Sequence, residues 1–258
     1  MKIVTWNVNS LSVRLPRVLE FLAAHAPDVV CLQETKCETA AFPGGELAGA
    51  GYRSVEHSAG RWAGVAILAR DDHSLTAGAA GLPGELRTEE ARWIEASIGD
   101  LHVASAYVPN GRALDSPSFE EKLAFFDAMR ARVGVLAAAG EQIVVTGDLN
   151  VTRDDRDVWD PAVFVGSTHV TPAERNRLEA IIETGGLVDS YRHVHPDDRQ
   201  FTWWDYRQGH FHRGMGLRID YVLLSRSLAP RLEHCGIERD FRKGHKPSDH
   251  APLVAVLA

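Results

Sequence analysis

Apolar segments of strand length recur along the whole chain, and several stop abruptly at polar residues. These segments predict strands at Lys2–Trp6, Asp28–Gln33, Gly64–Ala69, Ala91–Ile98, Leu101–Tyr107, Gln142–Thr146, Arg218–Leu224 and Pro252–Leu257. A helical spacing of apolar residues and N-terminal capping signals, including a capping box at Thr171 and Glu174, predict helices at Ser12–His25, Pro117–Ala139 and 172–183. The mixture indicates an α/β fold.

Domain organisation follows from the even spread of these segments. No repeat, low-complexity tract or linker-like stretch rich in Ser, Gly and Pro divides the 258 residues. Two-sheet architectures often reach this length as one unit. We therefore expect a single domain that spans residues 1–258.

Cysteine usage and hydropathy restrict the class of protein. The three cysteines, Cys31, Cys37 and Cys235, are odd in number and irregularly spaced, which fits neither a disulfide framework nor a zinc site. The chain shows no secretion leader and no apolar stretch near the ~18 residues that a membrane span needs. We expect a soluble, cytoplasmic, monomeric protein without a membrane partner.

The formal net charge of −7 argues against a nucleic-acid partner, because Lys and Arg supply much of the affinity for phosphates. The charge is unevenly distributed, however. Residues 200–258 carry nine Lys and Arg against six acidic residues, so the first 199 residues carry −10. The basic end is a candidate phosphate-facing surface, and a solvated surface of mixed charge is the alternative.

The polar residues at the ends of the predicted strands carry the functional information. Apolar runs lead into Asn7-Val8-Asn9, into Gln33-Glu34, into Tyr107-Val108-Pro109-Asn110 and into Gly147-Asp148-Leu149-Asn150. If these strands are neighbours in a sheet, their ends meet at one edge, which is where α/β proteins usually bind ligands.

The side chains at these ends suit a divalent cation. A carboxylate such as Glu34 after a buried run is unfavourable unless it is paired or bound to metal. For Glu34 taken alone, an ion pair with Lys36 or an arginine is the simpler explanation. For Asn9 and Asn150 the alternative is turn chemistry. Hard oxygen ligands favour Mg²⁺ or Mn²⁺ over zinc. The candidate ligand set is Asn7, Glu34, Asp148, Asn150 and Asp249.

Asp220 and the Ser248-Asp249-His250 motif add a possible acid or phosphate contact, because a carboxylate can orient and charge an imidazole. Hydrolysis of a phosphodiester needs a nucleophilic water, charge neutralisation on the phosphoryl oxygens and a stabilised leaving group. These residues supply candidates for all three. The chain has no Gly-x-Ser-x-Gly elbow and no Walker loop, which disfavours an esterase or a nucleotide-driven motor.

Seven motifs together resemble the endonuclease/exonuclease/phosphatase superfamily, and within it the exonuclease III-type abasic-site endonucleases, over nearly the whole chain. They begin at Trp6, Leu32, Tyr107, Gly147, Phe201, Leu217 and Ser248, and include Trp6-Asn7-Val8-Asn9, Gly147-Asp148-Leu149-Asn150 and Ser248-Asp249-His250. The resemblance implies an α/β four-layered sandwich of two packed mixed β-sheets flanked by helices. It also implies cleavage of duplex DNA 5′ to abasic sites and removal of nucleotides or blocking groups from 3′ ends.

The resemblance implies a role for each site residue. Glu34 would hold the metal, with Asn7, Asp249 and His250 close to it. Asp148 would orient or deprotonate the attacking water, and Asn150 would help to position it. Tyr107 and Asn110 would bind the phosphate, while His250, held by Asp220, would stabilise its charge. Asn9 is a further candidate for substrate contact, and Arg14 is an unassigned one.

The resemblance also implies a small apolar pocket for an extrahelical abasic sugar, formed by Trp203, Leu217 and Ile219, and we expect Trp204 in the core. Unstacking is least unfavourable where the base is already missing. Two alternatives remain: a relative that hydrolyses inositol or lipid phosphodiesters, and a catalytically silent nucleic-acid-binding module. The complete acidic set disfavours the second alternative.

Overall fold

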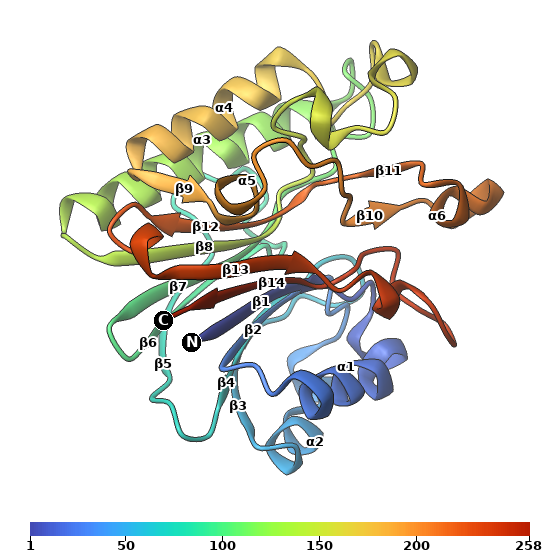
Figure 1. The fold of residues 1–258 in the computed structure, drawn as a ribbon. Coiled ribbons are helices and arrows are strands. Elements are labelled where there is room, and N and C mark those ends of the chain that lie inside the picture. The colour runs from blue at the N-terminus through green and yellow to red at the C-terminus, as the bar shows by residue number, and fades with distance from the viewer.

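Two six-stranded sheets form the centre of the computed structural model, which describes residues 1–258 (Figure 1). The first sheet, in the order β13-β14-β1-β2-β4-β3, consists of Leu232–Ile237, Leu253–Leu257, Lys2–Asn7, Val29–Gln33, Val65–Arg70 and Tyr52–His57. The second, in the order β5-β6-β7-β8-β12-β9, consists of Thr76–Ala80, Trp93–Ile98, Leu101–Tyr107, Gln142–Asp148, Asp220–Ser225 and Leu187–Asp189. A separate two-stranded ribbon pairs β10, Trp203–Trp204, with β11, Gly216–Leu217.

Helices cover the outer faces of both sheets (Figure 1). Helices α1, Leu11–His25, and α2, Gly44–Gly49, lie on the first sheet, and α3, Pro117–Ala138, and α4, Pro172–Thr184, lie on the second. Two short helices complete the fold, α5, Ser190–Val194, and α6, His210–Arg213. The chain also forms six 3₁₀ turns, at Thr39–Ala41, Asp155–Asp157, Pro161–Phe164, Arg207–Gly209, Ala229–Arg231 and Arg239–Arg242. The predicted four-layered α/β sandwich is confirmed.

Three apolar layers hold the four structural layers together. Clusters of 21, 20 and 14 buried residues lie between α3/α4 and the second sheet, between the two sheets, and between the first sheet and α1. Strand β8 shows why: Ile143 and Val145 belong to the outer cluster, whereas Val144 belongs to the cluster between the sheets. A strand that buries both faces needs a continuous apolar run, which is the pattern the sequence has there.

All eight predicted strands are confirmed within two residues of their ends. The three long helices and the capping box of α4 are also confirmed. The Gly99-Asp100 turn joins β6 to β7 as predicted. The prediction lacked six strands: β3, β5, β9, β10, β11 and β13. Strand β5 is exposed along its whole length and contains no large apolar residue, so hydrophobic periodicity cannot detect it.

All three cysteines are buried and unpaired. No helix combines the length and apolar character that crossing a bilayer requires. One member of the basic carboxy-terminal set differs from the expectation of a phosphate-facing surface. Arg218 is fully buried, and it bonds to Asp157 and Asp189 at 2.8 to 3.1 Å.

Arg218 supplies the first testable prediction. Its substitution by Met would leave Asp157 and Asp189 buried with less compensating charge, so we expect a loss of about 3–5 kcal/mol in the free energy of unfolding. Urea titration followed by circular dichroism measures it. The control is Arg177→Met, which removes a partly exposed pair with Asp127 and should change stability by about 1 kcal/mol or less. Equal losses in the two variants would contradict the structural role of Arg218.

Candidate active site

A cavity of about 290 Å³ lies where the ends of both sheets meet the β10–β11 ribbon. Nine of the residues predicted for the site line this cavity or its rim. The lining consists of Glu34, Tyr107, Asn110, Asp148, Asn150, His169, Trp203, Asp205, Arg207, Ile219, Asp249 and His250. The predicted convergence of strand ends is therefore present.

Two pairs of parallel strands explain this convergence. Strands β1 and β2 run in parallel with Asn7 opposite Gln33, and β7 and β8 run in parallel with Tyr107 opposite Asp148. Parallel neighbours end at the same edge, so their last residues meet. At Gly147 a Cβ atom would lie 1.9 Å from the carbonyl oxygen of Ala106, so only glycine permits this approach of β8 to β7.

Asp148 occupies the centre of the site and is 1% exposed. Its Oδ2 accepts a hydrogen bond from Asn7 Nδ2 at 2.9 Å, and its Oδ1 accepts one from the backbone N–H of Asn150 at 3.0 Å. Burial raises the pKa of Asp148 to about 7, with the neighbouring Asp220 carboxylate adding to the rise and His250 opposing it. A carboxylate with a pKa near neutrality suits proton transfer at physiological pH.

His250 is held between two carboxylates. Its Nδ1 donates to Asp220 Oδ2 at 2.8 Å, and its Nε2 lies 3.5 Å from Asp148 Oδ2. Burial alone would lower the pKa of His250, but Asp220 and Asp148 outweigh it and raise the pKa to about 10. The imidazole is therefore a cation at neutral pH, and Asp220 is the residue that orients it.

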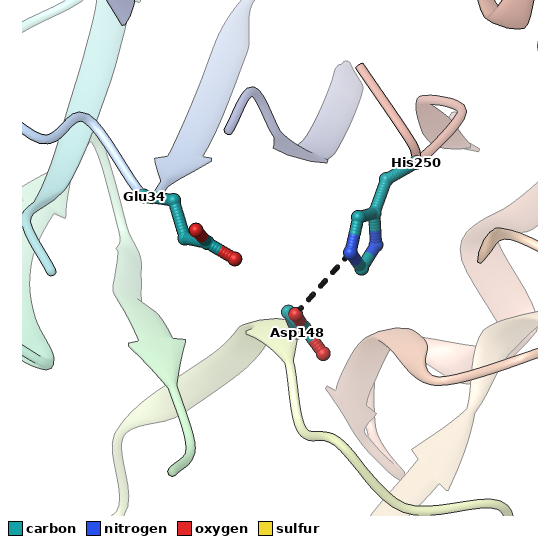
Figure 2. A group of neighbouring side chains, drawn as sticks. All are labelled: Glu34, Asp148 and His250. Atoms are coloured by element: carbon teal, nitrogen blue, oxygen red, sulfur yellow. Dashed lines mark ion pairs between the residues drawn. The ribbon is translucent and has the colours of Figure 1, made fainter. Parts of the chain in front are cut away.

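Glu34, Asp148 and His250 point into one space from three different segments (Figure 2). The two carboxylates are the candidate metal ligands, because a protonated imidazole has no lone pair to offer. Ligand atoms of the three lie within 4.8 Å of one another. Asn7 Nδ2 bridges Glu34 and Asp148 at 2.7 and 2.9 Å. The two carboxylates match the oxygen preference of Mg²⁺ and Mn²⁺, and their mutual repulsion would be relieved by a cation. The residues present therefore fit a divalent ion.

Glu34 also has the ion-pair partner that the sequence suggested as the simpler explanation. Lys36 Nζ lies 2.6 Å from Glu34 Oε2 and 2.7 Å from Asn9 Oδ1. Both Glu34 and Lys36 have positive φ angles, of 53° and 50°. The strained backbone turns both side chains towards the site, where they are partly exposed.

Asp249 lies between a polar and an aromatic neighbour. Its Oδ1 accepts from Asn9 Nδ2 at 3.0 Å, and its Oδ2 accepts from Trp203 Nε1 at 3.1 Å. Arg14 donates to the carbonyl oxygen of Asn9 and to the hydroxyl of Tyr206, which places its charge at the rim of the site.

Tyr107, Asn110 and Asn150 line the side of the cavity that faces α3. Burial raises the pKa of Tyr107 well above its usual value, and the Glu34 charge adds to the rise, so the hydroxyl stays protonated and can donate. Asn110 Nδ2 lies 3.3 Å from Asn150 Oδ1, and Asn150 Nδ2 donates to the carbonyl oxygen of Val108 at 3.0 Å.

The apolar pocket differs from the prediction. Trp203 and Ile219 line the cavity, and Trp204 is a core residue, 1% exposed. Leu217 is not among the residues that line the cavity; it is 1% exposed and packs in a buried cluster with Val158 and Ile219. The predicted apolar wall is therefore narrower than three side chains.

His169 lines the cavity and was not identified from the sequence. Its Nδ1 donates to the carbonyl oxygen of Asn150 at 2.6 Å, and its φ angle is 76°. Burial lowers the pKa of His169 to about 4, and Lys122 adds to the fall, so the imidazole is neutral. The residue lies in a loop outside every recognised motif, and only the neighbouring capping box of α4 could have drawn attention to it.

A buried ion pair supports this side of the site. Lys122 of α3 and Glu174 of α4 are both fully buried, with 2.5 Å between Lys122 Nζ and Glu174 Oε1. Lys122 also donates to the carbonyl oxygens of Asn150, at 2.6 Å, and Asn110, at 3.1 Å. One side chain thus fixes two of the loops that bear site residues.

Comparison with known proteins agrees with this geometry. A model of the endonuclease/exonuclease/phosphatase family matches residues 4–250. The exodeoxyribonuclease III of Haemophilus influenzae is 30% identical over 270 residues, with 99% of each chain covered. A 3′-5′ exonuclease from Neisseria meningitidis, NExo, has a TM-score of 0.94 and 37% identity over 100% of this chain and 99% of its own.

Two further structures have equally similar folds. One is described as the 3′ phosphatase NExo from Neisseria bound to product DNA hairpin, with 36% identity and a TM-score of 0.94. The other is an AP endonuclease from Archaeoglobus fulgidus, with 34% identity and a TM-score of 0.94. In both comparisons the match covers 100% of this chain and 99% of the chain in the other structure. The chain therefore belongs to the endonuclease/exonuclease/phosphatase family.

Proposed function

We propose that the protein is a metal-dependent DNA repair nuclease of the exodeoxyribonuclease III type, which hydrolyses phosphodiesters at the 3′ ends of duplex DNA and 5′ to abasic sites. The observation that carries the proposal is the arrangement in one cavity at the sheet ends, where His250 Nδ1 lies 2.8 Å from Asp220 Oδ2 and His250 Nε2 lies 3.5 Å from Asp148 Oδ2. The relatives that cut DNA share its fold over the whole chain.

In the proposed mechanism each residue of the site has a separate role. The Asp148 carboxylate accepts a proton from the attacking water, and its two hydrogen bonds fix its orientation. The His250 imidazolium donates to a phosphoryl oxygen and stabilises its growing charge. Tyr107 and Asn110 donate further hydrogen bonds to the phosphate. Asn150 holds Asn110 and Asp148 in place.

Glu34 and Asp148 would hold the divalent cation, with Asn7 fixing both carboxylates and Asp249 and His250 at its border. When bound, Mg²⁺ or Mn²⁺ supplies positive charge to the phosphoryl oxygens.

Of the two substrates, the 3′ end is the one that the cavity fits better. An abasic sugar displaced from the helix needs a recess with apolar walls, and here Leu217 is packed away while the polar His169 lines the space beside Trp203 and Ile219. A 3′-terminal phosphate or nucleotide needs access only to the polar centre. We therefore propose 3′-end removal as the main activity and abasic cleavage as a slower one.

The substrate prediction compares three DNA duplexes of one sequence, which carry a 3′ phosphate, a recessed 3′ end or one internal abasic site. In Mg²⁺ we expect cleavage of all three, with kcat/KM at least about tenfold lower at the abasic site, the scale of a poorly fitting pocket. EDTA should abolish every activity. Release of phosphate from an inositol phosphate, with no DNA cleaved, would reject the proposal in favour of the lipid-type alternative.

Substitution of the two central residues should separate catalysis from binding. Asp148→Asn and His250→Ala should each lower kcat by ~10²-fold or more, because each removes a charge that acts in the transition state. DNA binding, measured by fluorescence anisotropy, should change little. Asp197→Asn, at a side chain that is 97% exposed, is the matched control and should keep full activity. Near-normal turnover in either central variant would mean that its role is misassigned.

The pH profile follows from the same two groups. Asp148 must be a carboxylate, so kcat/KM should rise with pH through about 7, and His250 must be protonated, so kcat/KM should fall near pH 10. The acid limb should move to lower pH as the Mg²⁺ concentration rises, because cation and proton compete for Asp148. His250→Gln should lack the alkaline limb, and an alkaline limb retained in that variant would contradict the assignment.

A further inference from the structure

Three arginines of the chain are buried, and one of them has no acidic partner. Arg192 and Arg218 both form ion pairs with Asp157, and Arg218 pairs with Asp189 as well. Arg242, which is 7% exposed, takes part in no ion pair. A buried charge is normally compensated by a counterion, so Arg242 departs from the rule that the other two follow.

The surroundings of Arg242 satisfy its guanidinium only in part. Nη2 donates to the carbonyl oxygen of Trp204 at 3.2 Å, whereas Nε is buried without a partner. The guanidinium lies 4.8 Å from the ring centre of Tyr206 and 5.3 Å from that of Phe211. Burial lowers the pKa of Arg242, and the charges of Tyr206 and Asp249 oppose the fall only in part.

Arg242 lines a cavity of about 280 Å³, here called the Arg242 cavity, on the side of the β10–β11 ribbon where α6 lies. Lys243 and His210 also line it, and Asp205 is the only carboxylate among the ten lining residues. Asp205 is already paired with Arg207, at distances of 2.5 to 3.0 Å. A water molecule takes up about 30 Å³ in the liquid, so the space accepts a larger anion.

The Arg242 cavity adjoins the active site. Asp205 lines both cavities. The hydroxyl of Tyr206 donates to the carbonyl oxygen of Pro247 at 2.8 Å and accepts from Arg14 at 3.0 Å, and Arg14 contacts the backbone of Asn9 in the active site. A ligand that extends beyond the reacting phosphate can therefore reach the Arg242 cavity along the rim.

We propose that the Arg242 cavity binds a phosphodiester group of the bound DNA duplex other than the one that is hydrolysed. This inference rests on the proposed function, because it takes duplex DNA as the substrate. DNA presents a regular series of phosphates on either side of the reacting one, and a phosphate would supply the counterion that Arg242 lacks. Lys243 at the mouth contributes a flexible charge, since its ion pair with Asp240 is well exposed and weak.

Binding as a function of salt tests the inference. The probe is a fluorescent duplex with a 3′ phosphate, titrated in an Asp148→Asn background so that no cleavage interferes. Lys243→Gln and Arg242→Gln should each raise the Kd by roughly tenfold, the scale of a lost charged hydrogen bond. The dependence of log K on log[KCl] should become shallower by about 0.9 for each contact removed. The control, Arg130→Gln on the exposed face of α3, should change neither quantity.

A neutral backbone identifies the phosphate concerned. Methylphosphonates are placed one at a time at each position within several nucleotides of the 3′ end. A methylphosphonate at one position should weaken binding of the DNA to the protein with Arg242 intact. The same methylphosphonate should not weaken binding to the Arg242→Gln variant any further, because the two changes remove the same contact. Additive losses at every position would overturn the proposal.

Further measurements distinguish failure of this proposal from a folding defect in the variant and from failure of the proposed function. If Arg242→Gln unfolds, as judged by its thermal transition, the Lys243→Gln/His210→Gln double variant decides, and an unchanged salt slope in it overturns the proposal. Inorganic phosphate that binds this cavity without competing with DNA also overturns it. A wild-type protein that binds the probe as expected but never cleaves it would refute the proposed function alone.

Discussion

The pairing of β8 with β12 is the constraint on which the site depends, because its register sets Asp148 directly opposite Asp220. Two buried carboxylates side by side are unfavourable without a counterion. His250 supplies it from the segment that precedes β14 of the other sheet, with Nδ1 2.8 Å from Asp220 and Nε2 3.5 Å from Asp148. The same imidazolium thus completes the site and links the two sheets, so the catalytic arrangement cannot form before the sheets pack.

Backbone strain is concentrated where this arrangement needs it. Ten residues other than glycine have positive φ angles, and six of these lie at or beside the site: Asn9, Ser10, Glu34, Lys36, Asn150 and His169. Each such conformation is unfavourable by about 1–3 kcal/mol and persists only where its surroundings enforce it. Lys122 provides that enforcement on one side, through the carbonyl oxygens of Asn110 and Asn150. Four layers of packing therefore stabilise the turns that present the polar groups.

The sequence predicted most of the strands and nearly all of the polar site residues. An apolar run predicts a buried strand, and an Asp, Asn or Glu at the end of that run predicts a residue of the site. It could not predict His169. The loop of this residue carries no periodic pattern, and its position depends on Glu174, which the distant Lys122 holds in place. It also placed Leu217 in the wall of the cavity, whereas this side chain is 1% exposed and packs in a buried cluster with Val158 and Ile219. Tertiary contacts decided these positions, and a local pattern contains no information about them.

Net charge was the weakest guide to the partner, and burial explains why. Six acidic residues of the first 199 are buried: Glu85, Glu95, Asp148, Asp157, Glu174 and Asp189. Only two basic residues of this part, Lys122 and Arg192, are buried. The surface of these 199 residues is therefore less negative than their formal charge. In the basic end, Arg218 is neutralised internally. Attraction to DNA therefore depends on a few cations at the rim, such as Arg14 and Arg207, rather than on a general positive field. Because the cationic contacts are few, the position of each one has a larger effect on where along the duplex the protein binds.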